Sequence, residues 1–321
     1  MLNFRTDLAD ERRDIYKKAN QLEEINGIET EEEKINEDMK VKKVKIVNEE
    51  GERAIGKPKG TYITIDVKNL KVAQEEEIEK AAEVVTKELK ELIEKHVQKQ
   101  EEILVVGLGN EAVTADALGP KVVEKVEVTR HILKYVPQYA EENTRAVSAI
   151  APGVLGTTGM ETLEIVQGIV EKVHPKLLIV IDSLASRSIE RISSTIQLAD
   201  TGIAPGAGVG NRRKELTEET LGIPVIAVGV PTTVEAATIA ADSIDLMINT
   251  LEKGLEKQGE ESKEIEKIKE SLSHLMGDNK YGLIKEILAP EDYNFIVTPK
   301  EIDDLILNMS NVVARGINRA V

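Results

Sequence analysis

Short apolar runs in the middle of the chain constrain its fold more than any other feature of the sequence. They occupy residues 103–107, 146–151, 177–181, 192–198 and 225–230. Runs that are apolar throughout are typical of strands buried on both faces of a parallel sheet. The longer segments between them leave room for helices, so the sequence predicts an α/β fold whose mostly parallel sheet is layered with helices.

The residues before these runs predict further elements at the edge of this sheet. Residues 8–25 favour a helix in a strongly charged region. Apolar and polar residues alternate at 41–47 and again at 61–67, which predicts an added antiparallel β-hairpin near the N-terminus. Apolar side chains recur at helical spacing in residues 74–99, so an amphipathic helix is expected there.

The remaining local signals concern where helices begin. Thr-x-x-Glu sequences at 158–161 and 232–235 predict capping boxes, in which a hydroxyl and a carboxylate satisfy free amide groups at a helix start. Residues 295–297 predict a short strand. Pro299 follows it and predicts the first turn of a helix that runs from about residue 300 to residue 320.

Composition excludes several classes of function. The chain of 321 residues has no cysteine, which excludes disulfides, thiolate metal sites and a cysteine nucleophile. Its formal net charge of −16 argues against direct binding to nucleic acid. No signal peptide and no apolar run long enough to span a membrane is seen, so we expect a cytoplasmic protein without membrane contact.

Two aspartates are the strongest candidates for chemistry. Asp116 follows the first apolar run after a Gly107-Leu-Gly109 turn, and Asp182 ends the third run. Carboxyl ends of parallel strands meet at one edge of a sheet, where ligands bind. Two carboxylates brought close there share a proton, and such a pair can activate water and protonate a leaving amine. The alternative is that Asp116 caps a helix near Gly119 and Asp182 caps a turn.

Other candidate motifs are weaker. Gly107, Gly109 and Ala112 fit a loose dinucleotide fingerprint, but the acidic residue about 20 positions on, Glu127, falls in an expected helix. The glycine-rich residues 201–214 lack the ending of a phosphate loop, and a flexible loop at an active site or subunit contact is favoured. No histidine pair has the spacing of metal ligands, so we expect no metal and no cofactor. The histidines are His96, His131, His174 and His274.

A series of segments in one order resembles the germination protease family of Bacillus and Clostridium relatives. It runs from RTDLA at 5–9 to VTPKE at 297–301 and so covers most of the chain. One departure is Ala115, where proline is expected before the aspartate. The central segments are VGLGN at 106–110, TADALGP at 114–120, VTRH at 128–131, APGV at 151–154, IDSLASRSIER at 181–191, DTGI at 200–203 and PVIAVGVP at 224–231.

This resemblance implies an atypical aspartic endopeptidase that begins the degradation of small acid-soluble spore proteins during spore germination. It implies that Asp116 and Asp182 are the catalytic pair, that the fold is related to hydrogenase maturation endopeptidases, and that the chain forms a homotetramer in the forespore or spore core. Two alternatives stay open: a nickel-sensing endopeptidase of the hydrogenase-maturation type, and a non-enzymatic nucleotide-binding or structural spore protein.

The resemblance also implies a zymogen that processes itself. Family members remove a short propeptide at an acidic residue followed by an apolar residue and alanine, and Asp7, Leu8 and Ala9 fit that pattern. We therefore expect cleavage between Asp7 and Leu8, with an ordinary disordered terminus as the alternative. The expected organisation is a propeptide, 1–7, and a single catalytic domain, 8–321. Its parts are an N-terminal region 8–100, an α/β core 101–253, a charged insert 254–280 and a C-terminal segment 281–321.

Overall fold

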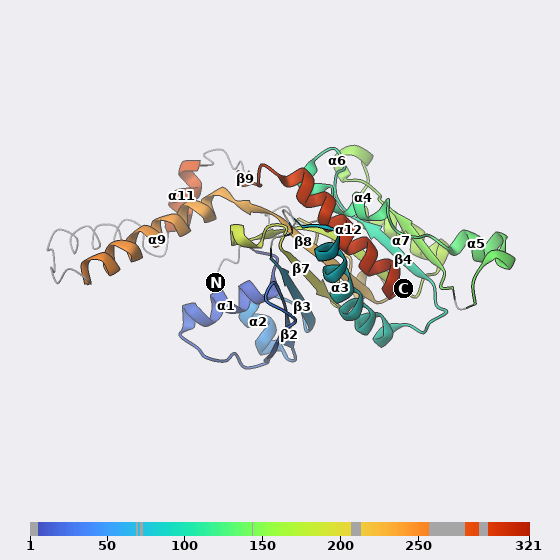
Figure 1. Ribbon diagram of the computed structural model, residues 1–321, viewed down its shortest axis with the longest axis horizontal. Coiled ribbons are helices and arrows are strands. Elements are labelled where there is room, and N and C mark those ends of the chain that lie inside the picture. Colours follow the sequence, from blue (N-terminus) through green and yellow to red (C-terminus); the bar gives the residue numbers. More distant parts are fainter. Residues whose placement is uncertain are drawn as a thin grey trace.

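A mixed sheet with helices on both faces forms the body of the protein (Figure 1). The computed structural model describes residues 6–68, 70, 73–142, 144–206, 213–256, 280–288 and 295–321. The strands are β1 (Ile28–Lys34), β2 (Met39–Ile46), β3 (Gly60–Val67), β4 (Ile103–Gly107), β5 (Val147–Ile150), β6 (Leu177–Ser186), β7 (Thr195–Ala199), β8 (Val225–Glu235) and β9 (Ile296–Val297). They lie in the order β1-β2-β3-β7-β8-β6-β4-β5, and β9 pairs with β8.

The described helices fall into three groups along the chain. Those of the N-terminal region are α1 (Ala9–Asn20), α2 (Glu49–Ile55) and α3 (Glu75–His96). Those of the core are η2 (Thr114–Asp116), α4 (Leu118–Val123), α5 (Arg130–Tyr135), η3 (Pro137–Tyr139), α6 (Leu155–Thr158), α7 (Thr162–Val173), η4 (Ile189–Arg191) and α8 (Glu218–Leu221). The last group is α9 (Ala236–Glu256), α11 (Lys280–Leu288) and α12 (Ile302–Ala320).

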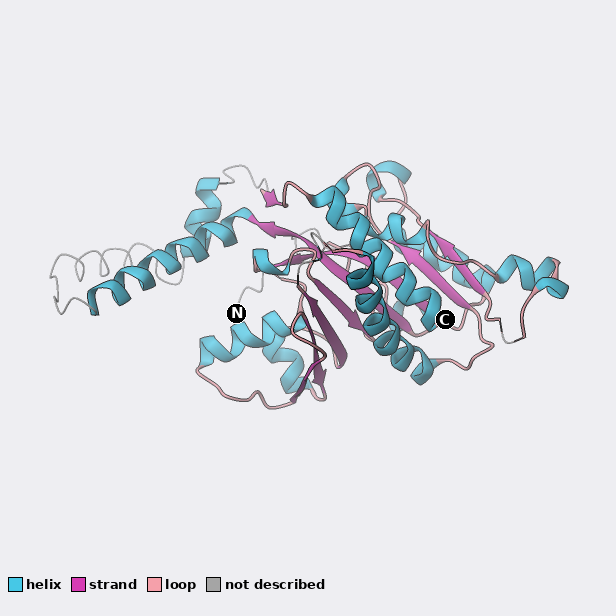
Figure 2. Cartoon of the chain, viewed as in Figure 1, coloured by secondary structure: helices cyan, strands magenta, loops and turns pink. Residues whose placement is uncertain are grey.

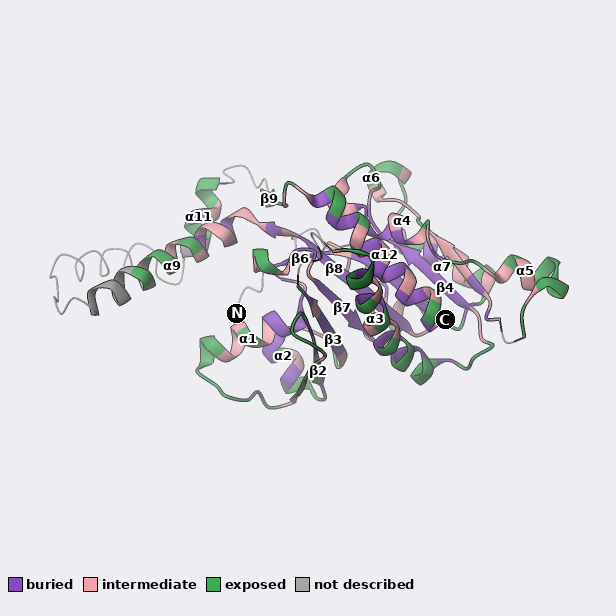
Figure 3. Cartoon of the chain, in the orientation of Figure 1, coloured by how far each residue is buried: buried purple, intermediate pink, exposed green. Residues whose placement is uncertain are grey.

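Alternating side chains of the central strands build two apolar layers. Ile103 and Val105 of β4 pack on the face covered by α3, α4 and α12. Leu104 and Val106 pack on the opposite face with α7, and the same face is covered further along the sheet by α1 and α2. The strands are buried between these layers (Figures 2 and 3), which is why they read as continuous apolar runs.

The α/β architecture expected from the sequence is confirmed, and so is the antiparallel pairing of β2 with β3. The parallel strands β5, β4, β6 and β8 lie together in one half of the sheet. One detail is wrong: β7 is antiparallel to both β3 and β8. The connection from β6 to β7, residues 187–194, is shorter than the dozen or so residues that a parallel crossover needs.

Both predicted capping boxes are also wrong. Residues 232–235 belong to β8, which continues as a strand because it pairs with the end of β6 and with β9. Thr158 is the last residue of α6, and its hydroxyl donates to the carbonyl of Val154. The helix that follows, α7, begins at Thr162 with Glu161 at its N-cap.

The C-terminal elements agree with the sequence, whereas most of the charged insert cannot be compared. β9 and α12 match the strand and helix expected at 295–297 and 300–320. Of the predicted insert 254–280, residues 257–279 lie outside the described residues. Helix α9 extends away from the body of the molecule in Figure 1. Among the described residues, no helix combines the length and the apolar character needed to cross a membrane.

Candidate active site

Asp116 is held by a tight turn after β4. It ends the short helix η2, where its amide donates to the carbonyl of Val113 (2.8 Å), and its Oδ2 accepts from the amide of Asn110 (2.8 Å). Gly109, with φ of 115°, lets this loop close: a Cβ atom there would lie 1.9 Å from the carbonyl oxygen of Asp116. The glycines of the suspected dinucleotide fingerprint therefore allow close packing around the aspartate.

Neither aspartate caps a helix, although capping was the alternative. The N-cap of α4 is Ala117, and no side chain accepts a hydrogen bond there. Asp182 lies within β6, between residues that pair with β8, and its Oδ1 accepts from the amide of Ser183 (2.9 Å). Asp116 is half-buried and Asp182 is buried, with 6% exposure. Burial of two carboxylates needs an explanation other than helix capping.

A cavity of about 640 Å³ lies between these two aspartates. Its walls combine polar groups, such as Asn110, Ser183 and Thr232, with apolar side chains, such as Val113 and Leu155. Such a mixed lining suits a peptide substrate, which presents both amide groups and apolar side chains.

Other residues of this wall come from distant parts of the chain. Arg213 brings a cation to the wall and lies 4.0 Å from Glu161. Ile296 of β9 and Thr298 contribute from the C-terminal segment.

The electrostatics of the pair follow from burial and proximity. Burial raises the pKa of Asp116, against a smaller lowering by the Asn110 amide. The pKa of Asp182 is raised well above its usual range, first by burial and then by the negative charges of Asp116 and Asp7, while the Ser183 amide opposes this. Asp182 therefore holds a proton more readily than Asp116 does, and one protonated and one ionised carboxyl can coexist.

The N-terminal segment reaches this site. The amide of Asp7 donates to the carbonyl of Ala185 (2.8 Å), and the amide of Ala185 donates to Oδ2 of Asp7 (3.0 Å). Leu8 and Ala9, which follow, are fully buried. Asp7 also lines the 640 Å³ cavity together with Asp116 and Asp182. The bond predicted for cleavage thus begins at a residue in the wall of the aspartate cavity.

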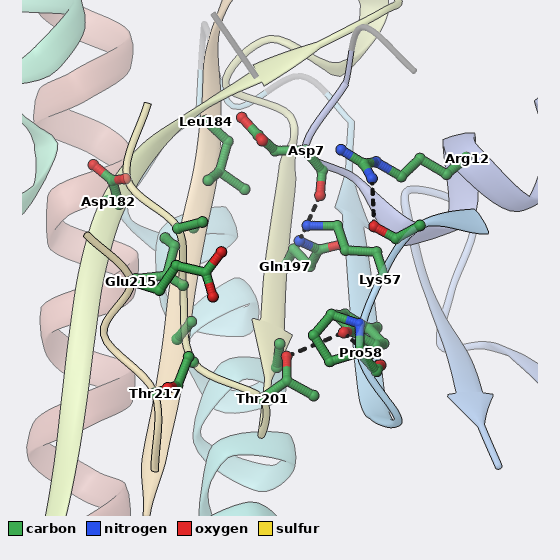
Figure 4. Close-up of a pocket in the computed structure, with 18 of the residues that line it drawn as sticks. Asp7, Arg12, Lys57, Pro58, Asp182, Leu184, Gln197, Thr201, Glu215 and Thr217 are labelled. Atoms are coloured by element: carbon green, nitrogen blue, oxygen red, sulfur yellow. Dashed lines mark hydrogen bonds between the residues drawn. The ribbon is translucent and has the colours of Figure 1, made fainter. Parts of the chain in front are cut away.

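A second, smaller cavity of about 130 Å³ adjoins the first (Figure 4). Asp7 and Asp182 line both cavities. In the smaller one, Nε2 of Gln197 donates to the carbonyl of Asp7 (3.3 Å) and the amide of Ala9 donates to Oε1 of Gln197 (2.7 Å). Burial lowers the pKa of Lys57 in this wall to about 8, with a further lowering by Arg12 that Asp7 and Glu215 oppose.

The remaining sequence candidates lie elsewhere or are not described. His96, His131 and His174 are exposed, and none of them lines either cavity. His274 and residues 207–212 of the glycine-rich stretch lie outside the described residues. Within the part of the chain that the structure describes, no group of three or more His, Cys, Asp or Glu side chains has the geometry of a metal site.

Some residues of the site could not be found from the sequence. Gln197 and Lys57 carry no motif, and the contact of Ala185 is made by its main chain. Gln197 is one of four polar residues in 192–198, and nothing in the sequence sets it apart from the other three. Its contact with Asp7 and Ala9 requires the fold.

Comparison with known proteins gives consistent matches over the whole chain. The germination protease family matches residues 5–273 and 261–321. A germination protease of Clostridium perfringens is 48% identical over 321 residues, covering 100% of this chain and 96% of that protein. Those of Caldanaerobacter subterraneus subsp. tengcongensis and Priestia megaterium are 47% and 43% identical, covering 100% and 99% of this chain and 95% and 94% of those proteins.

One solved structure also matches part of the chain. It is a [NiFe] hydrogenase maturation protease HycI from Thermococcus kodakarensis KOD1, with 18% identity and a TM-score of 0.28, and the match covers 43% of this chain and 79% of that one.

Proposed function

Since this chain belongs to the germination protease family, we propose that it is an aspartic-type endopeptidase in which Asp116 and Asp182 are the catalytic pair. The observation that carries the proposal is their joint position in one cavity, buried and electrostatically coupled. A buried carboxyl that holds a proton beside an ionised one supplies an acid and a base together.

The roles of the two carboxyls follow from their surroundings. Asp182 is the more buried group and has the more strongly raised pKa, so it carries the shared proton in the resting site. Asp116 is then the ionised member, which accepts a proton from the attacking water. Asp182 gives its proton to the leaving amine. The two titrate as a coupled pair, so a pH profile reports the pair as a whole.

Self-processing between Asp7 and Leu8 is the second part of the proposal. Asp7 lines the aspartate cavity, and its carboxylate is fixed by the Ala185 amide. Leu8 and Ala9 are fully buried, so a small apolar pair fits after the cleaved bond. Residues 1–7 are then a propeptide, whose Asp7 lies in the wall of the site before removal, and residues 8–321 are the catalytic domain.

The substrates follow from the family. Germination proteases act when spores germinate, and we propose that this chain cleaves small acid-soluble spore proteins in the spore core. The sequence around its own cleavage site, an acidic residue followed by Leu-Ala, gives the preference for substrates. From the family resemblance we also propose assembly as a homotetramer.

The experiment is incubation of the processed protein with a purified small acid-soluble spore protein, followed by mass-spectrometric mapping of every cut. The proposal predicts cuts after Asp or Glu and before an apolar residue. Cuts without an acidic residue before the bond would contradict the proposed specificity. An unchanged substrate would contradict the proposed substrate class.

A further inference from the structure

The sheet places Gln197 and Asp182 on either side of one glycine. Gly229 of β8 is the register partner of Asp182 on β6 and of Gln197 on β7. Register partners point their side chains to the same face, so both project beside Gly229, with main chains about 10 Å apart across two strand spacings. A Cβ atom on Gly229 would lie 2.4 Å from Leu184 Cδ1. The side chain of Leu184 therefore lies over Gly229, and only a glycine leaves room for it there.

The chain segment that Gln197 contacts is the one predicted to be cleaved. Gln197 is buried, with 6% exposure, and its side chain contacts both sides of the Asp7–Leu8 bond. Its Nε2 donates to the carbonyl of Asp7 (3.3 Å), and its Oε1 accepts from the amide of Ala9 (2.7 Å). Figure 4 shows Gln197 beside Asp7, with Leu184 between Asp7 and Asp182. The buried glutamine thus contacts the carbonyl of the Asp7–Leu8 peptide and the amide of the next peptide, Leu8–Ala9.

We infer that Gln197 is a further catalytic residue of self-processing, which holds the Asp7–Leu8 peptide and stabilises the negative charge that develops on the Asp7 carbonyl oxygen. This inference rests on the proposed function. A donor already placed on that oxygen needs no reorganisation when the charge forms, and this is the property that makes such groups effective.

Self-processing hydrolyses the Asp7–Leu8 peptide bond. Water adds to the carbonyl carbon of Asp7 and passes a proton to Asp116, and the oxygen, now negative, accepts a stronger hydrogen bond from Nε2 of Gln197. The bond to the nitrogen of Leu8 then breaks as Asp182 gives that nitrogen a proton. The products are a new carboxyl group on Asp7 and a new amino group on Leu8.

A structural role for the same glutamine makes a different prediction. Ala9 is the first residue of α1, so Gln197 could serve only as the acceptor for an amide at the helix start. The variant Gln197→Glu separates the two roles. An ionised glutamate accepts from Ala9 but cannot donate to Asp7, whereas a protonated one can do both. A role as acceptor alone would leave self-processing unchanged when residue 197 ionises, whereas a role as donor requires self-processing to slow.

The experiment measures the loss of residues 1–7 from the full chain by intact mass, between pH 4 and pH 8. This range begins near the ordinary pKa of a glutamate. The melting temperature of each variant is measured in parallel. Loss of one such donor costs about 10²-fold in rate. At pH 8 we expect Gln197→Glu to process itself about 10²-fold more slowly than the wild type. This ratio should narrow as pH falls. The ratio of the two rates is used because both proteins contain the other charged groups of the smaller cavity. These groups are Asp7, Arg12, Lys57, Asp182 and Glu215.

Two further variants complete the design. Gln167→Glu is the matched control, because Gln167 donates to the carbonyl of Thr220 (3.0 Å) and lines neither cavity. It should process at the wild-type rate. Gln197→Met keeps the volume without a donor or an ionisable group, and it replaces Gln197→Glu if that variant melts early. It should be slow at every pH.

The outcomes separate this inference from the proposed function. If the wild type processes while Gln197→Glu and Gln197→Met stay within about threefold of it, the role of Gln197 is wrong and the aspartate pair is untouched. If Gln197→Glu is slow but its ratio to the wild type does not change with pH, the role of Gln197 as donor is likewise wrong. If the wild type keeps residues 1–7 under all conditions, self-processing itself fails, and the inference falls with it.

Discussion

Asp7 and Ala185 exchange two hydrogen bonds: the Asp7 amide donates to the Ala185 carbonyl (2.8 Å), and the Ala185 amide donates to the Asp7 carboxylate (3.0 Å). The acidic side chain is thus recognised by the main chain of β6, three residues beyond Asp182. Among substitutions of residue 185, only proline removes a main-chain donor, so specificity at this position is built into the strand.

Replacement of Asp7 by leucine should slow self-processing. The variant removes the acceptor of the Ala185 amide, and hydrogen bonds to charged groups contribute about 1.5–3 kcal/mol, which corresponds to about 10–100-fold in rate if the contact persists in the transition state. A time course of intact mass measures the rate. Asp14→Leu is the control, since Asp14 is exposed and pairs with Arg13 on the outer side of α1. Equal rates for both variants would contradict recognition of the acidic side chain.

Asp182→Asn should stabilise the protein at neutral pH. The raised pKa of Asp182 means that the folded chain binds a proton which the unfolded chain has released, so stability falls as pH rises from about 4, the unfolded value, through the folded value. An asparagine never ionises and still accepts from the Ser183 amide. Urea denaturation across pH should give a flatter profile for this variant. Asp304→Asn, at an exposed site on α12, is the control and should keep the wild-type pH profile. If Asp304→Asn flattened the profile as much as Asp182→Asn does, burial of Asp182 would not be the cause.

Lys57→Met should also stabilise the chain, but over a different pH range. Because the pKa of Lys57 is lowered to about 8 in the folded protein, its charge costs stability below that pH. The cost disappears as pH rises from about 8 to about 10.4, the unfolded value. The advantage of Lys57→Met should therefore be largest at pH 7 and vanish near pH 10, in parallel urea titrations. The exposed neighbour Lys59, replaced in the same way, should show no such trend.

Arg191→Met should destabilise the fold by about 3 kcal/mol, because it removes the short ion pair of the buried Asp10 carboxylate and leaves the more distant Lys42, at 3.9 Å. Arg191 pairs with Asp10 (2.5 Å), whose side chain is fully buried, and with Asp66. The pair of Arg13 and Asp14 (2.6 Å) offers the comparison, since its carboxylate is exposed, and Arg13→Met should cost less than about 1 kcal/mol. Equal effects in equilibrium unfolding would show that burial of Asp10 does not matter.

The sequence predicted the elements whose pattern repeats locally. β4, β6 and β8 appear as apolar runs because both of their faces are covered, and α3 shows the period of a helix with one buried side. β1 was missed because its residues, IETEEEK, are nearly all charged. It forms an edge strand whose glutamates face lysines of β2, such as Glu31 opposite Lys43, and charge is how natural edge strands avoid aggregation.

The candidate site was predictable only in part. The rule for strand ends brought Asp116 and Asp182 to one edge of the sheet, and the structure places both in one cavity. Asp7 and Gln197 could not be added in this way, since they are 190 residues apart in sequence and meet only through the order of the strands. β7 lies next to β8 because of the antiparallel return that the sequence pattern did not reveal.

The most direct test of the central claim is the rate at which folded Asp116→Asn and Asp182→Asn variants cleave a small acid-soluble spore protein, compared with the wild type. Since an asparagine can neither accept nor donate the proton, each single variant should lose activity by about 10³-fold, in the range that acid–base groups contribute. Circular dichroism should show unchanged folding. If either variant, folded, cleaves the substrate at a rate near that of the wild type, the two aspartates are not the catalytic pair.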